Sequence, residues 1–476
     1  MNISNIKNNM RKAYNYMKKN GLKDTIYASM ERLQEDSKPY VYADIDEVTR
    51  ESQRKARFDV RTRFSIVVPT YETNEIFCRD MIKSVLNQTY PTFELIIVDA
   101  SASNKVENIV RSFTDDRISY MKMTDNRGIS ENTNAGIEVA SGQYIGLLDH
   151  DDLLTPNALY EMARKIERGK KDGVKYSFVY SDEDKCDTYA TRFYEPNFKP
   201  EFNIDLLLSN NYICHFLVMD AKLMKKLKLR KEYDGAQDHD LVLRAYRESN
   251  NPVGKVNKVL YHWRCHEDST ALNPESKLYA YEAGRRAAQD YLDERNMTGA
   301  VVPIKHNGFF RVQYGSLAGK GGEINSGSRQ PEIVDIFRSR FDIGVIGGPI
   351  VKLGRIVGGM IDETKTCPLD SALTGFSGYM HRNVLQQDVY AVDIRKMYIR
   401  KELFGVFENF VKEGKYGSLF NYDLTFGDRE MVFIGDYINT QGFDDNTIMD
   451  ASVDFCNNAK MEGYLIFYEP YLEEMI

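Results

Sequence analysis

The sequence predicts an α/β protein, and two observations support this fold class. Short apolar strands alternate with helical segments from residue 64 onward, which is typical of parallel sheets covered by helices. Three carboxylates, Asp149, Asp151 and Asp152, directly follow one of these strands, and open α/β sheets bind ligands beyond the carboxyl ends of their strands. The chain has 476 residues, 42% of them hydrophobic, so it accommodates two domains.

Each element of the first region follows from a local pattern. FSIVV at 64–68 is a short, mainly apolar run, which predicts a buried strand, and FELIIVDA at 93–100 predicts the next strand. The expected strands are 64–68, 93–100, 117–123, 143–149, 177–182 and 256–261. The expected helices between and after them are 75–88, 103–113, 130–140, 156–168, 220–228, 238–249 and 275–295.

The chain divides into four predicted parts. They are a helical N-terminal extension with a charged connector at 1–62, a first α/β domain at 63–315, a Gly- and Ser-rich linker at 316–330, and a second α/β region at 331–476.

The first 35 residues are predicted to form an amphipathic helix. Their apolar residues recur at steps of three and four, at Ile3, Ile6, Met10, Tyr14 and Met17. Residues 1–23 also hold six basic residues and no acidic one. Such a helix suits an anionic membrane surface, and the alternative is an ordinary amphipathic helix that docks on its own domain.

Composition excludes several classes of protein. The net charge of −7 gives no global affinity for nucleic acid. Six cysteines lie far apart without a CxxC pair, which favours reduced cytosolic thiols over a zinc site or a disulfide framework. We see no signal peptide and no apolar run near the ~18 residues that span a bilayer. We therefore expect a soluble, cytoplasmic chain that reaches the inner face of the membrane only peripherally.

The string LLDHDDLL at 147–154 carries the strongest chemical signal. Its carboxylates repel one another unless a cation or water compensates them. Their oxygens suit a hard divalent ion such as Mg²⁺ or Mn²⁺. The alternative is an acidic turn that caps the helix starting near Pro156. Five of the seven histidines lie between residues 150 and 266, and one of them could complete such a site.

A second acidic pair, Asp238 and Asp240, stands at an expected helix N-terminus. Acids are common there because they complement the helix dipole. The functional alternative is a general base that accepts a proton from a hydroxyl group.

Taken in order, several strings resemble those of the family 2 inverting glycosyltransferases, in particular the bacterial enzymes that build O-antigens and other surface polysaccharides. They are VVPTY at 67–71, SVLNQTY at 84–90, IIVDAS at 96–101, NRGISENTNAGI at 126–137, SGQYIGLLDHDD at 141–152, YSDEDK at 180–185, LLSNNYICH at 207–215, QDHDL at 237–241 and LYHWRCHEDST at 260–270. The resemblance covers about residues 64–315.

This resemblance implies a GT-A fold and assigns site residues by position. The expected nucleotide-sugar pocket contains Pro69, Thr70, Tyr71, Glu72, Asp99, Arg127, Asp149, His150 and Asp151. The expected metal ligands for Mn²⁺ or Mg²⁺ are Asp149, Asp151 and His266, with His262 as the second choice of histidine. Asp238 matches the catalytic base, and Asp182 and His215 fall on the acceptor side.

The implied reaction is a single inverting displacement on a nucleotide-diphospho-sugar, with a glycan or a lipid-linked glycan as acceptor. Three departures make the nucleotide site atypical, since Ala100 replaces a carboxylate, Thr133 an arginine and Gln237 a glutamate. The alternative is a degenerate transferase that acts as a binding scaffold.

The second region echoes the later half of the first. QDVYAVDIRKMYIRKELF at 387–404 is patterned like residues 210–227, and ASVDFCNNA at 451–459 like residues 237–245. In that alignment Ser452 stands opposite Asp238, so we expect a partial and catalytically silent unit, which could support a homodimer. Chance similarity between short α/β segments is the alternative.

Overall fold

The structure is a computed structural model, and it describes residues 40–59, 61–266, 278–315, 330–421 and 424–472, with six isolated positions before residue 30. The predicted N-terminal helix and the linker at 316–330 lie almost wholly outside the described residues. Internal contacts divide the chain into two compact units. The N-terminal unit comprises Pro39–Phe202 and Asn210–Tyr291, and the C-terminal unit comprises Asn203–Ser209 and the chain from Leu292 onward.

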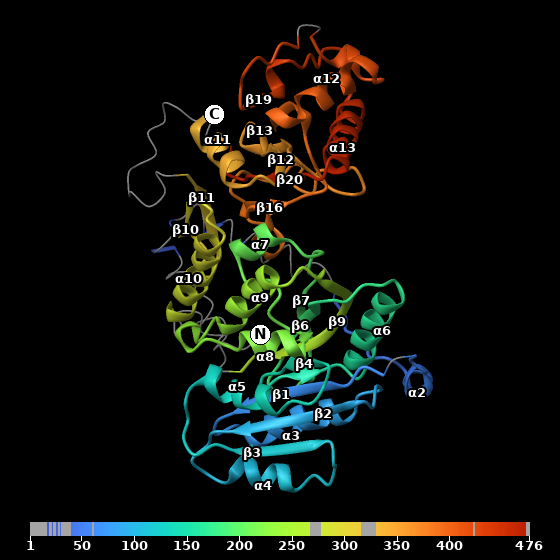
Figure 1. The fold of residues 1–476 in the computed structure, drawn as a ribbon, viewed down its shortest axis with the longest axis vertical. Coiled ribbons are helices and arrows are strands. Elements are labelled where there is room, and N and C mark those ends of the chain that lie inside the picture. Colours follow the sequence, from blue (N-terminus) through green and yellow to red (C-terminus); the bar gives the residue numbers. More distant parts are fainter. Residues whose placement is uncertain are drawn as a thin grey trace. The chain divides into compact units, whose positions relative to one another are not determined.

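The N-terminal unit is built on one nine-stranded mixed sheet (Figure 1). Its strands are β1 (Phe64–Thr70), β2 (Phe93–Asp99), β3 (Ile118–Lys122), β4 (Tyr144–Leu147), β5 (Leu153–Leu154), β6 (Phe178–Cys186), β7 (Phe193–Asn197), β8 (Leu217–Asp220) and β9 (Gly254–Arg264). Their order is β3-β2-β1-β4-β8-β6-β9-β5, with β7 paired to β6. The first four strands are parallel, β8 runs antiparallel to β4 and β6, and β6 is parallel to β9.

Helices cover both faces of this sheet. They are α2 (Glu47–Lys55), α3 (Glu75–Leu86), α4 (Lys105–Arg111), α5 (Ile129–Val139), α6 (Ala158–Lys171), α8 (Ala221–Leu227), α9 (Gln237–Glu248) and α10 (Leu278–Glu294), with a short 3₁₀ turn η1 (Lys231–Tyr233). Ile66 and Val68 share one buried core with residues of α3, α4 and α6. Val67 points to the opposite face because side chains alternate along a strand, and α5 approaches there so closely that a Cβ on Gly136 would lie 2.6 Å from Val67 Cγ1.

The α/β prediction for this region is confirmed element by element. Every strand and helix expected between residues 64 and 295 is present, with ends shifted by a few residues. The sequence missed the short strands β5, β7 and β8, and also α7 (Ile204–Ser209). These elements have six or fewer residues, too few for a periodic pattern to emerge. None of the helices described is long and apolar enough to cross a membrane.

The C-terminal unit has a smaller α/β architecture. Its five-stranded sheet has the order β16-β20-β12-β18-β19, formed by β12 (Ile343–Gly347), β16 (Gln387–Asp388), β18 (Met397–Arg400), β19 (Met431–Phe433) and β20 (Leu465–Tyr468). Two-stranded sheets pair β10 (Gly299–Pro303) with β11 (Phe310–Tyr314), β13 (Ile350–Lys352) with β14 (Arg355–Gly358), and β15 (Met360–Ile361) with β17 (Ala391–Val392). The helices are α11 (Gln330–Ser339), α12 (Phe404–Glu413) and α13 (Asp445–Met461). Short 3₁₀ turns lie at Tyr379–Val384, Ile394–Lys396, Lys401–Leu403, Gly417–Leu419 and Ile434–Asp436.

Helix α7 belongs to the C-terminal unit although its sequence lies in the middle of the first predicted domain. Asp205 pairs with Arg340, and the side chains of both are 2% exposed. The side chain of Asn203 donates to the backbone oxygen of Asp388 at 2.8 Å. The sequence had placed both this helix and residues 292–315 with the first domain, because chain order does not reveal which core a short apolar helix joins.

Candidate functional site

The acidic string forms the turn between β4 and β5. Strand β4 ends at Leu147, and β5 pairs with β9, so that Leu153 lies opposite His262. This arrangement places the carboxylates beside the carboxyl end of β9. The aspartates predicted from the sequence therefore lie near a strand that carries histidines.

Asp152 is the buried member of the string, and it has a structural role. Its Oδ2 accepts a hydrogen bond from the Tyr261 hydroxyl at 2.5 Å, and its Oδ1 accepts one from the backbone N–H of Arg264 at 2.7 Å. Burial, together with the neighbouring carboxylates of Asp151 and Asp149, raises the pKa of Asp152 well above its usual value. Asp152 thereby ties the end of β9 to the acidic turn.

Asp151 faces His266, and the sequence had proposed both residues as metal ligands. His266 Nε2 lies 2.9 Å from Asp151 Oδ2. Burial alone would raise the pKa of Asp151, but the hydrogen bond from His266 and the nearby His150 hold it below its usual value. His150 Nδ1 is buried without a hydrogen-bond partner and lies 4.0 Å from Asp151 Oδ1. A buried nitrogen of this kind next to a carboxylate is a position that a ligand, a water or a metal ion would satisfy.

His215 completes the acidic cluster on the other side. Ligand atoms of Asp149, Asp152 and His215 lie within 4.8 Å of one another, and His215 Nε2 is 3.7 Å from Asp149 Oδ2. The His215 ring stacks on Tyr261 with centroids 4.5 Å apart, which fixes its plane. The sequence had assigned His215 to the acceptor side, and in the structure it lies against the acidic turn.

A buried glutamate orients His215 from behind. His215 Nδ1 lies 3.2 Å from Glu183 Oε2, and Lys199 Nζ lies 3.3 Å from the same oxygen. Burial opposes ionisation of Glu183, but Lys199 and His215 outweigh it and lower its pKa to about 2. Burial likewise opposes the charged form of His215, whereas Cys214, Asp149 and Glu183 raise its pKa well above the usual value. A carboxylate behind an imidazole is the arrangement that sets the tautomer of metal-binding histidines.

Asp238 lies in the first turn of α9 and contacts the loop before β8. Asn211 Nδ2 donates to Asp238 Oδ2 at 2.7 Å, and Cys214 Sγ lies 3.3 Å from the same oxygen. Cys214 Sγ is also 3.3 Å from His215 Nε2, so one side chain bridges the predicted base and the acidic cluster.

Asp240, the other acid of that turn, is structural. It is 1% exposed, Arg230 donates to both of its oxygens, and Arg244 donates to Oδ2. Asp238, which the sequence favoured as the base, has Asn211 and Cys214 as its hydrogen-bond donors, whereas Asp240 is bound by two arginines.

Asp99 ends β2 on the predicted nucleotide side. Its carboxylate is buried and accepts hydrogen bonds from Ser101 N at 2.9 Å, Tyr120 at 2.7 Å and Lys122 Nζ at 3.0 Å. Burial would raise the pKa of Asp99, but these donors hold it below its usual value. Thr70 at the end of β1 lies beside it, with its hydroxyl 3.4 Å from Asp99 Oδ1.

The remaining nucleotide-side residues surround the same strand ends. Pro69 precedes Thr70 in β1, and Tyr71 just after the strand is 54% exposed. Glu72 has a φ of 46° and accepts from Ser103 N and Oγ at 2.9 and 2.7 Å, which fastens the loop after β1 to the loop after β2. The Arg127 side chain is 51% exposed and pairs with Asp125 at 3.3 Å. Tyr71 and Arg127 therefore remain accessible to a ligand.

Two predicted residues are not brought to the acidic cluster. His262 is buried, its Nδ1 lies 2.5 Å from Asp184 Oδ1, and its ring packs against Tyr42 and Phe193. Asp182 is also buried, and it accepts from the backbone N–H of Lys199 at 2.9 Å. Burial raises the pKa of Asp182. Both side chains have partners of their own away from Asp149.

Four residues of the site were not predicted individually: Asn211, Cys214, Glu183 and Tyr261. The signal was present, because YSDEDK and LLSNNYICH were singled out as strings. The sequence did not tell which residues of these strings face the site. A shift of one residue along β6 exchanges Asp182 for Glu183 on the face toward His215.

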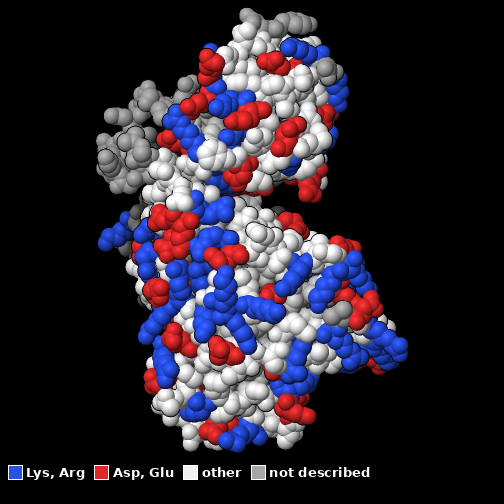
Figure 2. Space-filling view, viewed as in Figure 1, with Lys and Arg blue, Asp and Glu red and all other residues white. Residues whose placement is uncertain are grey.

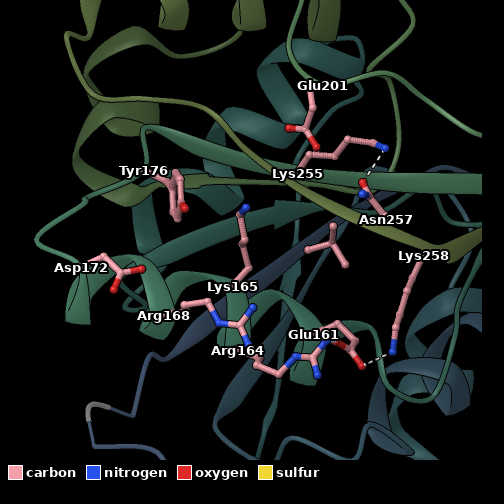
Figure 3. A pocket seen from close by; sticks show the side chains of 11 residues that line it. Glu161, Arg164, Lys165, Arg168, Asp172, Tyr176, Glu201, Lys255, Asn257 and Lys258 are labelled. Carbon is pink, nitrogen blue, oxygen red and sulfur yellow. Dashed lines mark hydrogen bonds and ion pairs between the residues drawn. The ribbon is translucent and has the colours of Figure 1, made fainter. Parts of the chain in front are cut away.

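A cavity of about 400 Å³ lies elsewhere, between α6 and the start of β9 (Figure 3). Its wall includes Lys165, Arg168 and Lys255, together with Glu161, whose carboxylate pairs with Lys258 at 2.7 Å. None of the residues of the acidic cluster lines it. Since β9 rises ~3.3 Å per residue, this cavity is distant from the end of β9 that meets Asp152.

The part of the chain that carries this site is similar to known glycosyltransferases. A profile described as "Glycosyl transferase family 2" matches residues 65–228. The putative colanic acid biosynthesis glycosyl transferase WcaA of Escherichia coli is 31% identical over 204 residues, which are 41% of this chain and 71% of that protein.

Two longer relatives match over about half of this chain. The uncharacterized protein y4gI of Sinorhizobium fredii is 38% identical over 245 residues, 50% of this chain. The O-antigen biosynthesis protein RfbC of Myxococcus xanthus is 31% identical over 274 residues, 56% of this chain. The matched segments span only 26% and 21% of these two relatives.

Proposed function

The chain belongs to glycosyl transferase family 2, and on that premise we propose that it is an inverting, metal-dependent glycosyltransferase. Its sheet at residues 64–264 is the GT-A sheet of this family. The donor is a nucleotide-diphospho-sugar, and the acceptor is a hydroxyl group of a growing surface polysaccharide or lipid-linked glycan. The names of RfbC and WcaA, which refer to O-antigen and colanic acid biosynthesis, support this class of product.

One observation carries the proposal. Ligand atoms of Asp149, Asp152 and His215 lie within 4.8 Å of one another, Asp151 of the same turn faces His266, and Cys214 links His215 to Asp238. A sugar transferase of this kind needs a site for a charged diphosphate next to a base. The aspartates and histidines are proposed to form the first, and Asp238 the second.

The donor set fits a divalent cation such as Mn²⁺. It combines carboxylate oxygens, which suit Mg²⁺ and Mn²⁺, with imidazole nitrogens, which Mg²⁺ rarely accepts. The unpartnered His150 Nδ1 beside Asp151 adds a further unsatisfied donor atom. We propose Asp149, Asp151 and His266 as ligands with His215 as an additional candidate, while Asp152 and His262 serve the protein framework. When bound, the cation neutralises charge that develops on the leaving diphosphate.

The residues of the chain perform the remaining steps. Asp238 accepts the proton of the acceptor hydroxyl while that oxygen attacks the anomeric carbon, a contribution on the order of 10²–10⁴ in rate. Asp99 and Thr70 receive the nucleoside, with Tyr71 and Arg127 exposed beside them. Because attack and departure occur on opposite faces of the sugar, one displacement inverts the anomeric centre and needs no nucleophilic side chain.

The C-terminal unit is proposed to be catalytically silent. Ser452, which aligns with Asp238, is fully buried, and its hydroxyl accepts from Ile394 N at 2.9 Å and donates to Ile448 O at 2.7 Å. The unit supplies no carboxylate at that position, so a binding or assembly role, including a homodimer, is the better proposal for it.

The function is tested by titrating a panel of nucleotide sugars in the presence of Mn²⁺ by calorimetry, with transfer and hydrolysis of the same donors as the activity readout. Asp151→Asn should abolish metal-dependent donor binding because it removes a charged oxygen ligand. Asp172→Asn is the matched control, since Asp172 is exposed at the end of α6. Unchanged donor affinity in Asp151→Asn would show that the metal site is assigned to the wrong residues.

A further inference from the structure

We propose that Asn211 is a positioning residue for the proton transfer, and that with Cys214 it holds one oxygen of Asp238 so that the other oxygen is left to receive the proton. This inference rests on the proposed function. It adds a residue that acts through the base, and it does not depend on the identity of the donor sugar or of the acceptor.

The contacts to Asp238 are one-sided. Asn211 Nδ2 donates to Oδ2 at 2.7 Å, and the Cys214 thiol donates to the same atom at 3.3 Å. Within the part of the chain that the structure describes, no hydrogen bond reaches Oδ1 of Asp238. A carboxylate held in this way keeps a fixed plane and has one oxygen with its lone pairs available.

A general base needs this kind of restraint. The proton acceptor must come within about 2.6–3.2 Å of the hydroxyl oxygen, and a carboxylate that rotates freely spends little time in that geometry. A neutral amide suits the task better than a charged donor, because hydrogen bonds from charged groups are roughly twice as strong and would hold the carboxylate in its ionised form.

The same helix provides the contrast. Asp240 lies two residues after Asp238, and Arg230 and Arg244 bond both of its oxygens. Such a carboxylate has no oxygen left over, which is what a structural ion pair requires. The neutral donor on Asp238 and the arginines on Asp240 therefore distinguish the two acids of the QDHDL string by function.

The loop that carries Asn211 is itself held in place. Asn211 Oδ1 accepts from the backbone N–H of Cys214 at 3.4 Å, which orients the amide so that its nitrogen faces Asp238. Cys214 Sγ also lies 3.3 Å from His215 Nε2. The segment from Asn211 to His215 thus contacts both the base and the acidic cluster, so it can set the distance between the acceptor and the donor.

The experiment compares Asn211→Ala and Asn211→Asp with wild type in steady-state transfer, measured against pH, together with donor binding by calorimetry. Asn211→Ala should lower kcat by about 10- to 100-fold, a part of the general-base contribution, and leave donor affinity with Mn²⁺ within twofold. Asn211→Asp should move the acidic limb of the kcat profile to higher pH by about one unit or more, because a second carboxylate beside Asp238 raises its pKa.

Asn134→Ala is the matched control. Asn134 also uses both ends of its amide, bonding the backbone of Leu229 at 2.8 Å in each direction, and among the described residues its side chain makes no hydrogen bond to the site. This variant should lower Tm without moving the pH limb. Thermal unfolding of every variant separates loss of folding from loss of positioning, and Asn211→Ser serves as a smaller change if Asn211→Ala does not fold.

The outcomes separate the two proposals. If wild type neither binds nor turns over any nucleotide sugar, the proposed function fails. If wild type is active and folded Asn211→Ala keeps kcat within twofold, or Asn211→Asp leaves the pH limb in place, the positioning role is wrong. If Asp238→Asn retains more than about a tenth of wild-type transfer, the base lies elsewhere, and the positioning role falls with it while the transferase assignment stands.

Discussion

Arg340 and Asp205 form a buried ion pair in the C-terminal unit although 135 residues separate them in the chain. Arg340 Nη2 lies 3.2 Å from Asp205 Oδ2, and Arg340 Nε lies 2.8 Å from Asp342 Oδ1. The Tyr314 hydroxyl accepts from the same guanidinium at 3.2 Å. Helix α7, which lies within the family-matched residues 65–228, is therefore held to the core of the C-terminal unit by an ion pair.

Arg340→Ala should destabilise the protein by about 3–5 kcal/mol, because it leaves the buried carboxylate of Asp205 without its partner. The measurement is urea unfolding followed by circular dichroism. Arg338→Ala is the control, since that side chain is 61% exposed and its solvent-screened pair with Glu430 should contribute little to stability. Equal losses in the two variants would contradict the assignment. A chain truncated at residue 318 lacks Arg340 and should show the same defect as Arg340→Ala, or a larger one.

The sequence predicted the first strands of the sheet well because their centres are short apolar runs. In β2 the run Leu95–Val98 is apolar and every residue of the strand is buried. It failed where pattern carries no information. The sequence of helix α7 does not indicate which core the helix joins. The ion pair of its Asp205 with Arg340 places it in the C-terminal unit.

The site shows the same limit at the scale of single residues. Asp151 and Asp152 are adjacent and chemically identical, yet one faces His266 and the other is buried under Tyr261. His262 lies within β9, whereas His266 follows the end of that strand at Arg264. Register decides each case, and register depends on pairing partners that are distant in the chain.

The second prediction concerns the nucleotide side. Asp99→Asn should weaken binding of the nucleotide by about 10-fold or more, because a hydrogen bond to a charged group contributes about 1.5–3 kcal/mol. Ser101 N retains an acceptor in this variant, and Lys122 is partly exposed, so the fold should persist. Calorimetry with nucleoside diphosphates measures the effect. Asp115→Asn, which loses a comparable pair with Arg117, should bind as wild type. Equal affinity in Asp99→Asn would remove Asp99 from the pocket.

The third prediction concerns pH. Burial and the nearby Asp205 raise the pKa of Asp388 to about 6. The folded state therefore binds this proton more tightly than the unfolded chain, whose aspartates titrate near 3.9. The free energy of unfolding should fall as pH rises from about 4 to 6, by about 1–3 kcal/mol, and then level off. Asp388→Asn should remove that decline, as measured by urea unfolding at several pH values. Asp428→Asn, at an exposed position, should keep it. A decline that persists unchanged in Asp388→Asn would point to another group.

The fourth prediction concerns the membrane. Deleting residues 1–23 should reduce binding to vesicles that contain anionic lipid, since each basic residue near such a surface contributes about 1 kcal/mol. Figure 2 shows Lys and Arg gathered over α8 and α9 as well. Lys222 of α8 and Lys231 of the adjoining turn η1 are exposed. Lys222→Gln with Lys231→Gln is therefore the comparison. Sedimentation with vesicles should respond to the deletion and to salt. If instead only the lysine pair matters, the N-terminal segment has no such role and the surface of α8 carries the contact.

The last prediction concerns the silence of the C-terminal unit. The Ser452 hydroxyl bonds two backbone groups inside the fold, so Ser452→Ala should cost about 1–2 kcal/mol of stability and leave kcat unchanged. Asp454, the neighbouring acid of α13, accepts from the Tyr416 hydroxyl at 2.6 Å and lies 3.4 Å from Lys415 Nζ, so its charge is also used locally. Asp454→Asn should therefore change Tm slightly and leave transfer unchanged.

Both variants are assayed with the donor that wild type selects, next to Asp238→Asn, which should keep donor binding and lose transfer. Light scattering of each variant reports whether any change in activity follows a change in assembly. Loss of transfer in Ser452→Ala or Asp454→Asn, with Tm and mass as in wild type, would place part of the chemistry in the C-terminal unit and end the proposal that it is silent.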